Sequence, residues 1–144
     1  MNRDQLISPD ITVADLNKMS ADTMVDNIGI EFLDIGPDFI TAKMPVDKRT
    51  IQPYGLLHGG ASVALAETLG SVAAHASIDS SKYMAVGLEI NANHIKSARS
   101  GHVVGIARPI HIGRNTHVWE IRISNEDDAL ISISRLTVSI IEKR

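Results

Sequence analysis

Hydrophobic and polar residues alternate along most of the second half of the chain. Four stretches show this period of two, which is typical of strands that bury one face. They are residues 83–96, 101–112, 116–124 and 129–141. The gaps between them (SARS, GRN and NEDD) are short enough for consecutive strands to be antiparallel neighbours. The second half therefore predicts one antiparallel sheet.

The first half combines a helical segment with a short strand pair. Apolar residues within 10–27 recur at helical spacing, with Asp10 or Thr12 as possible caps. Residues 28–35 and 39–46 alternate on either side of a Gly-Pro-Asp turn and so predict a hairpin.

One central stretch, residues 61–78 (ASVALAETLGSVAAHASI), has the length of a helix and is apolar on nearly every face. Such a helix is expected to be buried. A long antiparallel sheet curved around it would bury it, so the predicted fold class is α+β. We expect an N-terminal helical segment over residues 1–27 and a single domain over residues 28–144.

Composition narrows the classes of function. The 144 residues carry a formal net charge of −3 and only 3% aromatic residues, so neither charge nor stacking favours a nucleic-acid partner. The chain has no cysteine, which excludes disulfides, thiolate metal sites and a cysteine nucleophile. No signal peptide or membrane-spanning run is present, and we expect a cytoplasmic protein without a membrane partner.

A carboxylate, Glu67, interrupts the apolar helix. Burying a carboxylate is costly unless it is paired, hydrogen-bonded or functional. Ser71 lies one turn later, where its hydroxyl could fix the carboxylate. The helix is also preceded by His58 and two glycines, and the free N–H groups of a helix start suit a developing oxyanion. The alternative, an outward-pointing Glu67 paired with a cation, stays open.

The separation of Gly59 and Glu67 has a geometrical consequence. Eight residues of helix span about 12 Å at roughly 1.5 Å per residue, so one small reacting group cannot touch both. Two antiparallel helices across a two-fold axis would bring the start of one beside the middle of the other. The spacing therefore predicts a homodimer with shared active sites.

Other chemistries lack their motifs. Six scattered histidines form no metal-binding pair, Ser62 lies outside a nucleophile elbow, and no phosphate-binding glycine loop occurs, so we expect no metal and no cofactor. His75 is interpreted as a polar helix end. We expect His102 and His117 on the solvent side of strands, and Trp119 in the core.

Three segments, in this order, resemble a known family: PYGLLHGGASVALAETLGS, VGLEINANHIKSARSG and RPIHIGRNTHVWEIRI. Over about residues 28–141 the chain is similar to hotdog-fold acyl-CoA thioesterases of the 4-hydroxybenzoyl-CoA thioesterase type II (PaaI-like) branch. Within that branch the segments look most like the 1,4-dihydroxy-2-naphthoyl-CoA thioesterase of menaquinone synthesis and the proofreading thioesterase of enterobactin synthesis. The resemblance implies a long curved sheet around one helix, and dimers that usually pair into tetramers.

The resemblance also implies roles for particular residues. Glu67 would act as nucleophile or as general base for water, with Ser71 beside it. The Gly59 amide and the Gln52 side chain would polarise the thioester carbonyl, and His58 would hold the acyl group or the leaving thiolate. Contacts with the acyl-CoA substrate would come from Gly87, His94, Ile95, Lys96, Ser97, His111, Ile112, Gly113, Arg114, Asn115 and Thr116.

The expected activity is hydrolysis of acyl-CoA thioesters, with aromatic acyl groups expected, to free acid and CoA. Two alternatives remain. An acyl-thioester hydratase would use a differently placed histidine and acid, whereas Gln52, His58 and Glu67 have the thioesterase spacing. A non-catalytic acyl-CoA sensor would lack the carboxylate and carry an added DNA-binding segment.

Overall fold

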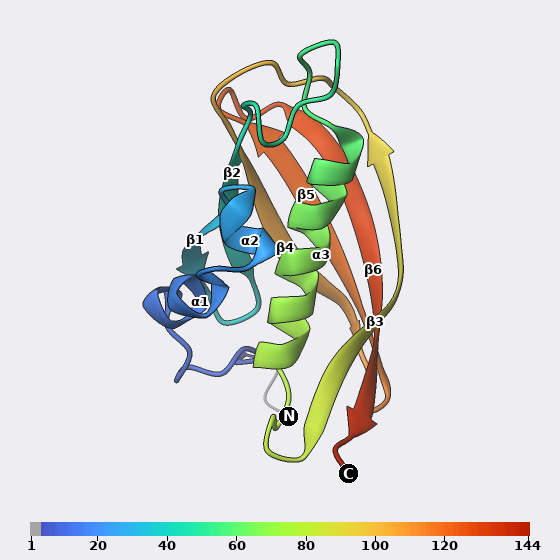
Figure 1. The fold of residues 1–144 in the computed structure, drawn as a ribbon. Coiled ribbons are helices and arrows are strands. Elements are labelled where there is room, and N and C mark those ends of the chain that lie inside the picture. The colour runs from blue at the N-terminus through green and yellow to red at the C-terminus, as the bar shows by residue number, and fades with distance from the viewer. Residues whose placement is uncertain (1–3) are drawn as a thin grey trace.

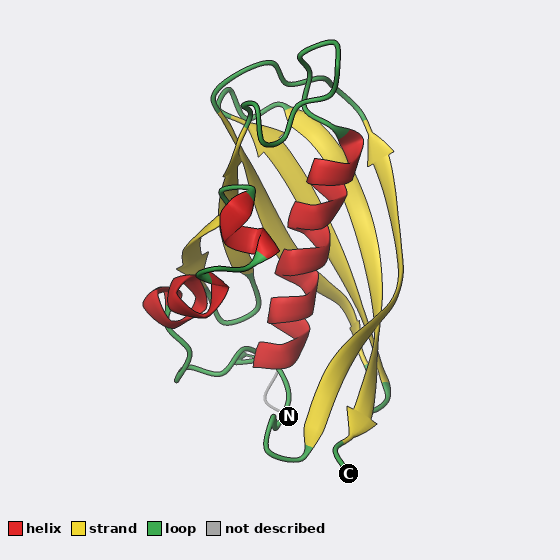
Figure 2. Cartoon of the chain, viewed as in Figure 1, coloured by secondary structure: helices red, strands yellow, loops and turns green. Residues whose placement is uncertain are grey.

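A curved antiparallel sheet with one long helix against its concave face dominates the structure, a computed structural model that describes residues 4–144 (Figures 1 and 2). This is the predicted α+β architecture. The elements are α1 (Val13–Ser20), α2 (Met24–Asn27), β1 (Glu31–Ile35), β2 (Ile40–Pro45), α3 (Gly59–Ala76), β3 (Tyr83–His94), β4 (His102–Ile112), β5 (Thr116–Asn125) and β6 (Leu130–Glu142).

The strand order is β1-β2-β4-β5-β6-β3, with every neighbouring pair antiparallel. The predicted hairpin of β1 and β2 is confirmed, as are the pairings of β4 with β5 and of β5 with β6. The prediction that β3 neighbours β4 is wrong. Residues 95–101 instead carry the chain across the end of the sheet, so β3 pairs with β6 and forms one edge (Figure 1).

The core lies between α3 and the inner face of the sheet. Leu65 and Leu69 of α3 are fully buried, as are Trp119 and Leu136 of the facing strands. Trp119 is therefore a core residue, as predicted. The opposite face of α3, which includes Val63 and Glu67, is only partly buried. In the single chain α3 is thus covered on one side, and its other apolar side has no cover among the described residues.

The N-terminal segment packs onto the same core. Thr12 caps α1 in a capping box with Asp15, Ile7 is fully buried, and the Asn17 side chain bonds both the N–H and the carbonyl of Phe32. The division of the chain at residues 27 and 28 stays a prediction, and residues 1–3 of the first segment lie outside the described residues.

The predicted exposure of His117 is wrong. Its side chain is 1% exposed, because it shares the inner face of β5 with Trp119. Its Nδ1 has no hydrogen-bond partner among the described residues. Burial lowers the pKa of His117, and the nearby His111 lowers it further. His102 is exposed, as expected, with Nδ1 lying 3.5 Å from a Glu126 oxygen.

Candidate active site

The start of α3 presents one unused backbone donor. His58 is the N-cap, and its Nδ1 accepts a hydrogen bond of 2.8 Å from the Gly60 N–H. An Nδ1 that accepts leaves the proton of neutral His58 on Nε2, which can therefore donate. No described residue accepts a hydrogen bond from the Gly59 N–H. This N–H lies at the positive end of the helix dipole and is free to bind an oxygen that gains negative charge.

A side-chain donor lies in the same region. The Gln52 Oε1 accepts a hydrogen bond of 2.5 Å from the Tyr54 N–H, within a turn closed by the bond from Gly55 N–H to Gln52 O. Because its oxygen is occupied, the Gln52 amide offers its NH₂ group. Gln52 and Gly59 line one hollow of about 590 Å³, here called the Gln52 hollow. These two donors together can polarise a carbonyl group.

Four of the predicted substrate contacts, His94, Ile95, Lys96 and Ser97, line the Gln52 hollow as well. A Cβ on Gly59 would lie 2.9 Å from His94 Nε2, so a larger residue at position 59 would push the His94 side chain away from the start of α3. The N–H groups of Ile95 and Lys96 both bond the Ile131 carbonyl, which holds this segment against the end of β6.

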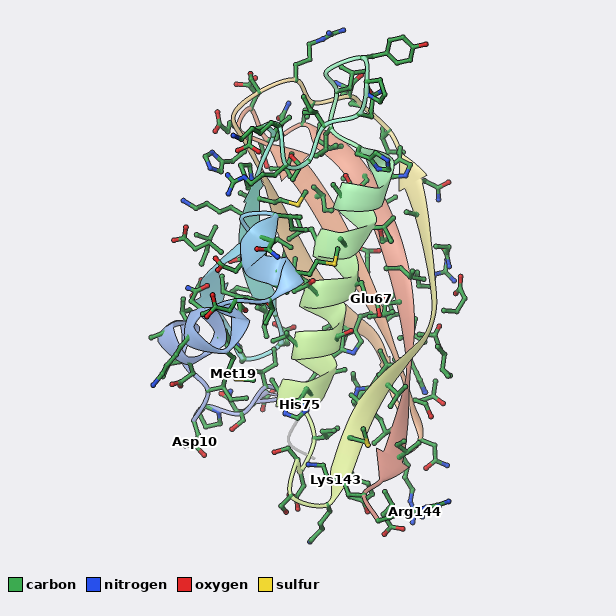
Figure 3. The ribbon with its side chains drawn as sticks, viewed as in Figure 1. Asp10, Met19, Glu67, His75, Lys143 and Arg144 are labelled. Carbon is green, nitrogen blue, oxygen red and sulfur yellow. The ribbon has the colours of Figure 1, made fainter. Side chains whose placement is uncertain are left out.

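Glu67 lies midway along α3, on the partly buried face (Figure 3). It lines a groove of about 470 Å³ formed with Val63 and Ala64 of α3 and Gly87 and Leu88 of β3, here called the Glu67 groove. Ser71 Oγ lies 3.5 Å from Glu67 Oε1, a long contact. No lysine or arginine among the described residues forms an ion pair with Glu67. The carboxylate is thus open for chemistry.

Gly87 allows the carboxylate to approach the edge strand. A Cβ at position 87 would lie 2.6 Å from Glu67 Oε1, so any larger residue would displace it. Gly87 is therefore beside Glu67 rather than beside the Gln52 hollow.

The remaining predicted substrate contacts are not brought to this region. Residues 111–116 comprise the end of β4, the turn and the first residue of β5, at the end of the sheet opposite the start of α3 (Figure 1). There the Gly113 N–H bonds the Thr116 carbonyl. Within one chain the two groups of predicted contacts are thus separated by the length of the sheet.

Sequence reasoning missed one part of the site region. Met24 and Ile28, in and just after the four-residue helix α2, line a hollow that also touches His58 and Gly60. A helix this short leaves no periodic pattern that could place it against α3.

The described residues hold neither a cluster of metal-binding side chains nor a helix suited to a membrane. Within residues 4–144 no three side chains of the metal-binding types gather closely enough to hold an ion. In the same part of the chain, no helix has the length and apolar character to cross a membrane.

Comparisons with known proteins show the family of the chain. The family model described as Thioesterase superfamily matches residues 54–132. The 1,4-dihydroxy-2-naphthoyl-CoA hydrolase of Escherichia coli is 50% identical over 131 residues, covering 91% of this chain and 96% of that protein. The proofreading thioesterase EntH of Cronobacter turicensis is 45% identical over 130 residues, covering 90% and 94%.

The fold has a close match among solved structures. The crystal structure of a mutant thioesterase from Pseudomonas aeruginosa superposes with a TM-score of 0.94 at 47% identity, covering 96% of this chain and 100% of that chain. This match confirms the predicted hotdog fold, and the two relatives carry the two activities that the sequence resembles most.

Proposed function

The chain belongs to the thioesterase superfamily and is a thioester hydrolase, and on this premise we propose that it hydrolyses acyl-CoA thioesters with aromatic acyl groups. The observation that carries the proposal is that α3 holds both groups the reaction needs. The Gly59 N–H has no acceptor among the described residues, and the Glu67 carboxylate forms no ion pair there. Half of the residues aligned with a 1,4-dihydroxy-2-naphthoyl-CoA hydrolase are identical, which supports the choice of acyl group.

The reaction follows from the groups present. The Gly59 N–H and the Gln52 NH₂ bind the thioester oxygen and stabilise the negative charge that develops on it. Glu67 either attacks the carbonyl carbon or takes a proton from the attacking water. If Glu67 attacks, the carbon–sulfur bond breaks to leave a mixed anhydride, and water then hydrolyses the anhydride to free acid and restores the carboxylate. If Glu67 instead takes a proton from water, the hydroxide adds to the carbonyl carbon and the carbon–sulfur bond breaks to give the free acid. In both routes the proton that water loses passes to the departing sulfur, so that CoA leaves as the thiol. His58, with its proton on Nε2, can donate a hydrogen bond to the sulfur or the acyl group.

A two-fold axis through the Glu67 groove would complete the site. β3 is an edge strand that pairs with β6 on one side only, its midpoint lies between Leu88 and Glu89, and Leu88 is 63% exposed. The groove sets that midpoint against Val63 and Ala64 of α3. Pairing two β3 strands about this axis would cover both the edge and the apolar face of α3. It would also set Gly60 of one chain opposite the partner's Glu67.

The same axis would reunite the separated substrate contacts. The two-fold rotation would bring the partner's β4–β5 loop to the end of the sheet where Lys96 and the Gln52 hollow lie. Arg114 of that turn and Lys96 can then meet phosphate groups of CoA by charge-assisted hydrogen bonds. We propose that such dimers pair again into tetramers. We also propose that the protein works in the cytoplasm, because its substrates are CoA esters and it has no cysteine.

Thiol release tests the activity directly. Benzoyl-CoA, 1,4-dihydroxy-2-naphthoyl-CoA and a medium-chain acyl-CoA are supplied to wild type and to Glu67→Ala, with a chromogenic thiol reagent. We expect turnover of the aryl esters and a loss of roughly 100-fold or more in kcat for Glu67→Ala. Glu120→Ala is the matched control, since Glu120 lies on β5, away from the Glu67 groove.

Two outcomes would overturn the proposal. Binding of CoA esters by folded wild type without thiol release would indicate a non-catalytic acyl-CoA binding protein. A medium-chain enoyl-CoA is supplied as well, and addition of water across its double bond without thiol release, followed by mass spectrometry, would indicate a hydratase.

A further inference from the structure

A small apolar hollow adjoins the start of α3 on the side away from the Gln52 hollow. It has a volume of about 240 Å³ and lies between α2 and α3, with Met24, Ile28 and Ile51 as its apolar walls; we call it the Met24 hollow. His58 and Gly60 form its inner end. It therefore begins at the two residues that flank the free Gly59 N–H.

The polar residues that border the Met24 hollow are already satisfied. Arg49, on its rim, is paired with Asp47 at 2.6 Å. Thr50 is 2% exposed and donates its hydroxyl to the Pro45 carbonyl at 2.6 Å. A ligand in this hollow therefore meets apolar surface, apart from the imidazole of His58.

The three spaces around the start of α3 differ in what they can accept. The Gln52 hollow ends at Lys96 and Ser97, which suit the polar arm and phosphates of CoA. The Glu67 groove would be filled by the partner helix in the proposed dimer. The Met24 hollow, bordered by the two residues that flank Gly59, is the remaining space at the start of α3, and its walls are mostly apolar.

We propose that the Met24 hollow receives the aryl part of the thioester and that Met24 sets the size of acyl group that the enzyme accepts. This inference rests on the proposed thioesterase function and adds the residue that determines its specificity. Met24 is 63% exposed in the single chain although it is apolar, so a bound aryl group would cover it. Its unbranched, polarisable side chain can also adjust to a flat ring.

The test changes the size of the side chain at position 24 in both directions. kcat/KM is measured for 1,4-dihydroxy-2-naphthoyl-CoA and for the smallest acyl-CoA that wild type hydrolyses, and the ratio of the two values is compared. Met24→Trp should lower this ratio roughly tenfold or more, because the indole fills the hollow. Met24→Ala enlarges the hollow, so it should raise the ratio or allow the enzyme to hydrolyse bulkier esters.

Met19→Ala is the matched control. Met19 is 71% exposed, lies on α1 and does not border the hollow (Figure 3), so the ratio should stay within about twofold of wild type. Inhibition by free CoA should be the same in all four proteins, because CoA without an acyl group does not reach the Met24 hollow.

The inference and the proposed function fail in different ways. If wild type hydrolyses no thioester, the proposed function is wrong. If wild type is active but the ratio is unchanged in both Met24 variants, the Met24 hollow does not hold the acyl group. A weaker inhibition by free CoA in Met24→Trp would place the CoA arm there instead and overturn the inference.

Discussion

At the scale of single residues, the contact between Gly87 and Glu67 gives a sharp prediction. Gly87→Ala would place a methyl group 2.6 Å from Glu67 Oε1 and force the carboxylate to turn away. A misplacement of about 1 Å can cost roughly 100-fold in rate, so we expect kcat to fall by between roughly 10-fold and 100-fold. The melting temperature should change little, because the displaced group is a flexible side chain.

The double variant Gly87→Ala, Glu67→Ala separates this effect from damage to β3. If Gly87 acts through the carboxylate, the double variant should be no less active than Glu67→Ala alone. If Gly87→Ala lowers kcat by the same factor in the Glu67→Ala background as in wild type, Gly87 matters for some other reason, such as strand pairing at the sheet edge.

His117 makes a prediction about pH and stability. Its pKa is lowered in the folded state by burial and then by His111, so below the ordinary value of 6.5 the unfolded chain takes up a proton that the folded chain resists. The stabilising contribution of neutral His117 is complete above pH 6.5 and is lost as pH falls toward the lowered pKa of the folded state. The free energy of unfolding, measured by urea denaturation between pH 7.5 and pH 5, should therefore decline less steeply in His117→Phe than in wild type. Equal slopes would contradict this assignment.

At the scale of elements, His58 joins a structural and a chemical role at the start of α3. His58→Ala removes the bond to the Gly60 N–H and should cost about 1 kcal/mol of stability, in line with the loss of other N-caps. His58→Asn restores an N-cap acceptor but has no group in place of the Nε2 donor. We expect Asn to recover the stability measured by urea denaturation while kcat stays as low as in the Ala variant. Recovery of kcat by Asn would limit His58 to a structural role.

Local patterns predicted the elements well but not their arrangement. Alternation located β3 to β6, and the Gly-Pro-Asp turn located the hairpin, because both signals come from neighbouring residues. The short gap after β3 wrongly predicted a neighbour in β4, since a short loop can also cross the end of a sheet. His117 was misplaced because its polar ring was expected to face solvent, although alternation puts it on the same face of β5 as Trp119, two residues later.

At the scale of the whole molecule, the sequence points to candidate site residues but not to how one chain groups them. Glu67 and the glycines before α3 were found because a carboxylate and glycines are unusual in and beside an apolar helix. Resemblance gave the substrate contacts, yet one chain places residues 94–97 and 111–116 at opposite ends of the sheet. In the proposed dimer their grouping depends on a second subunit, which local sequence patterns do not describe.

Mixed dimers test whether the active site is shared between subunits. Gln52→Ala and Glu67→Ala chains with different affinity tags are coexpressed, and the mixed dimer is isolated by both tags. A shared site pairs Gln52 from one chain with Glu67 from the other, so one of the two sites in the mixed dimer is intact and about half of the wild-type activity should return. A dimer of Gln52→Ala with a chain carrying both substitutions has no intact site and should remain inactive. If both mixed dimers are inactive, Gln52 and Glu67 of the same chain must act together, and the 12 Å of helix that separate Gly59 from Glu67, at roughly 1.5 Å per residue, would have to be bridged by the substrate itself.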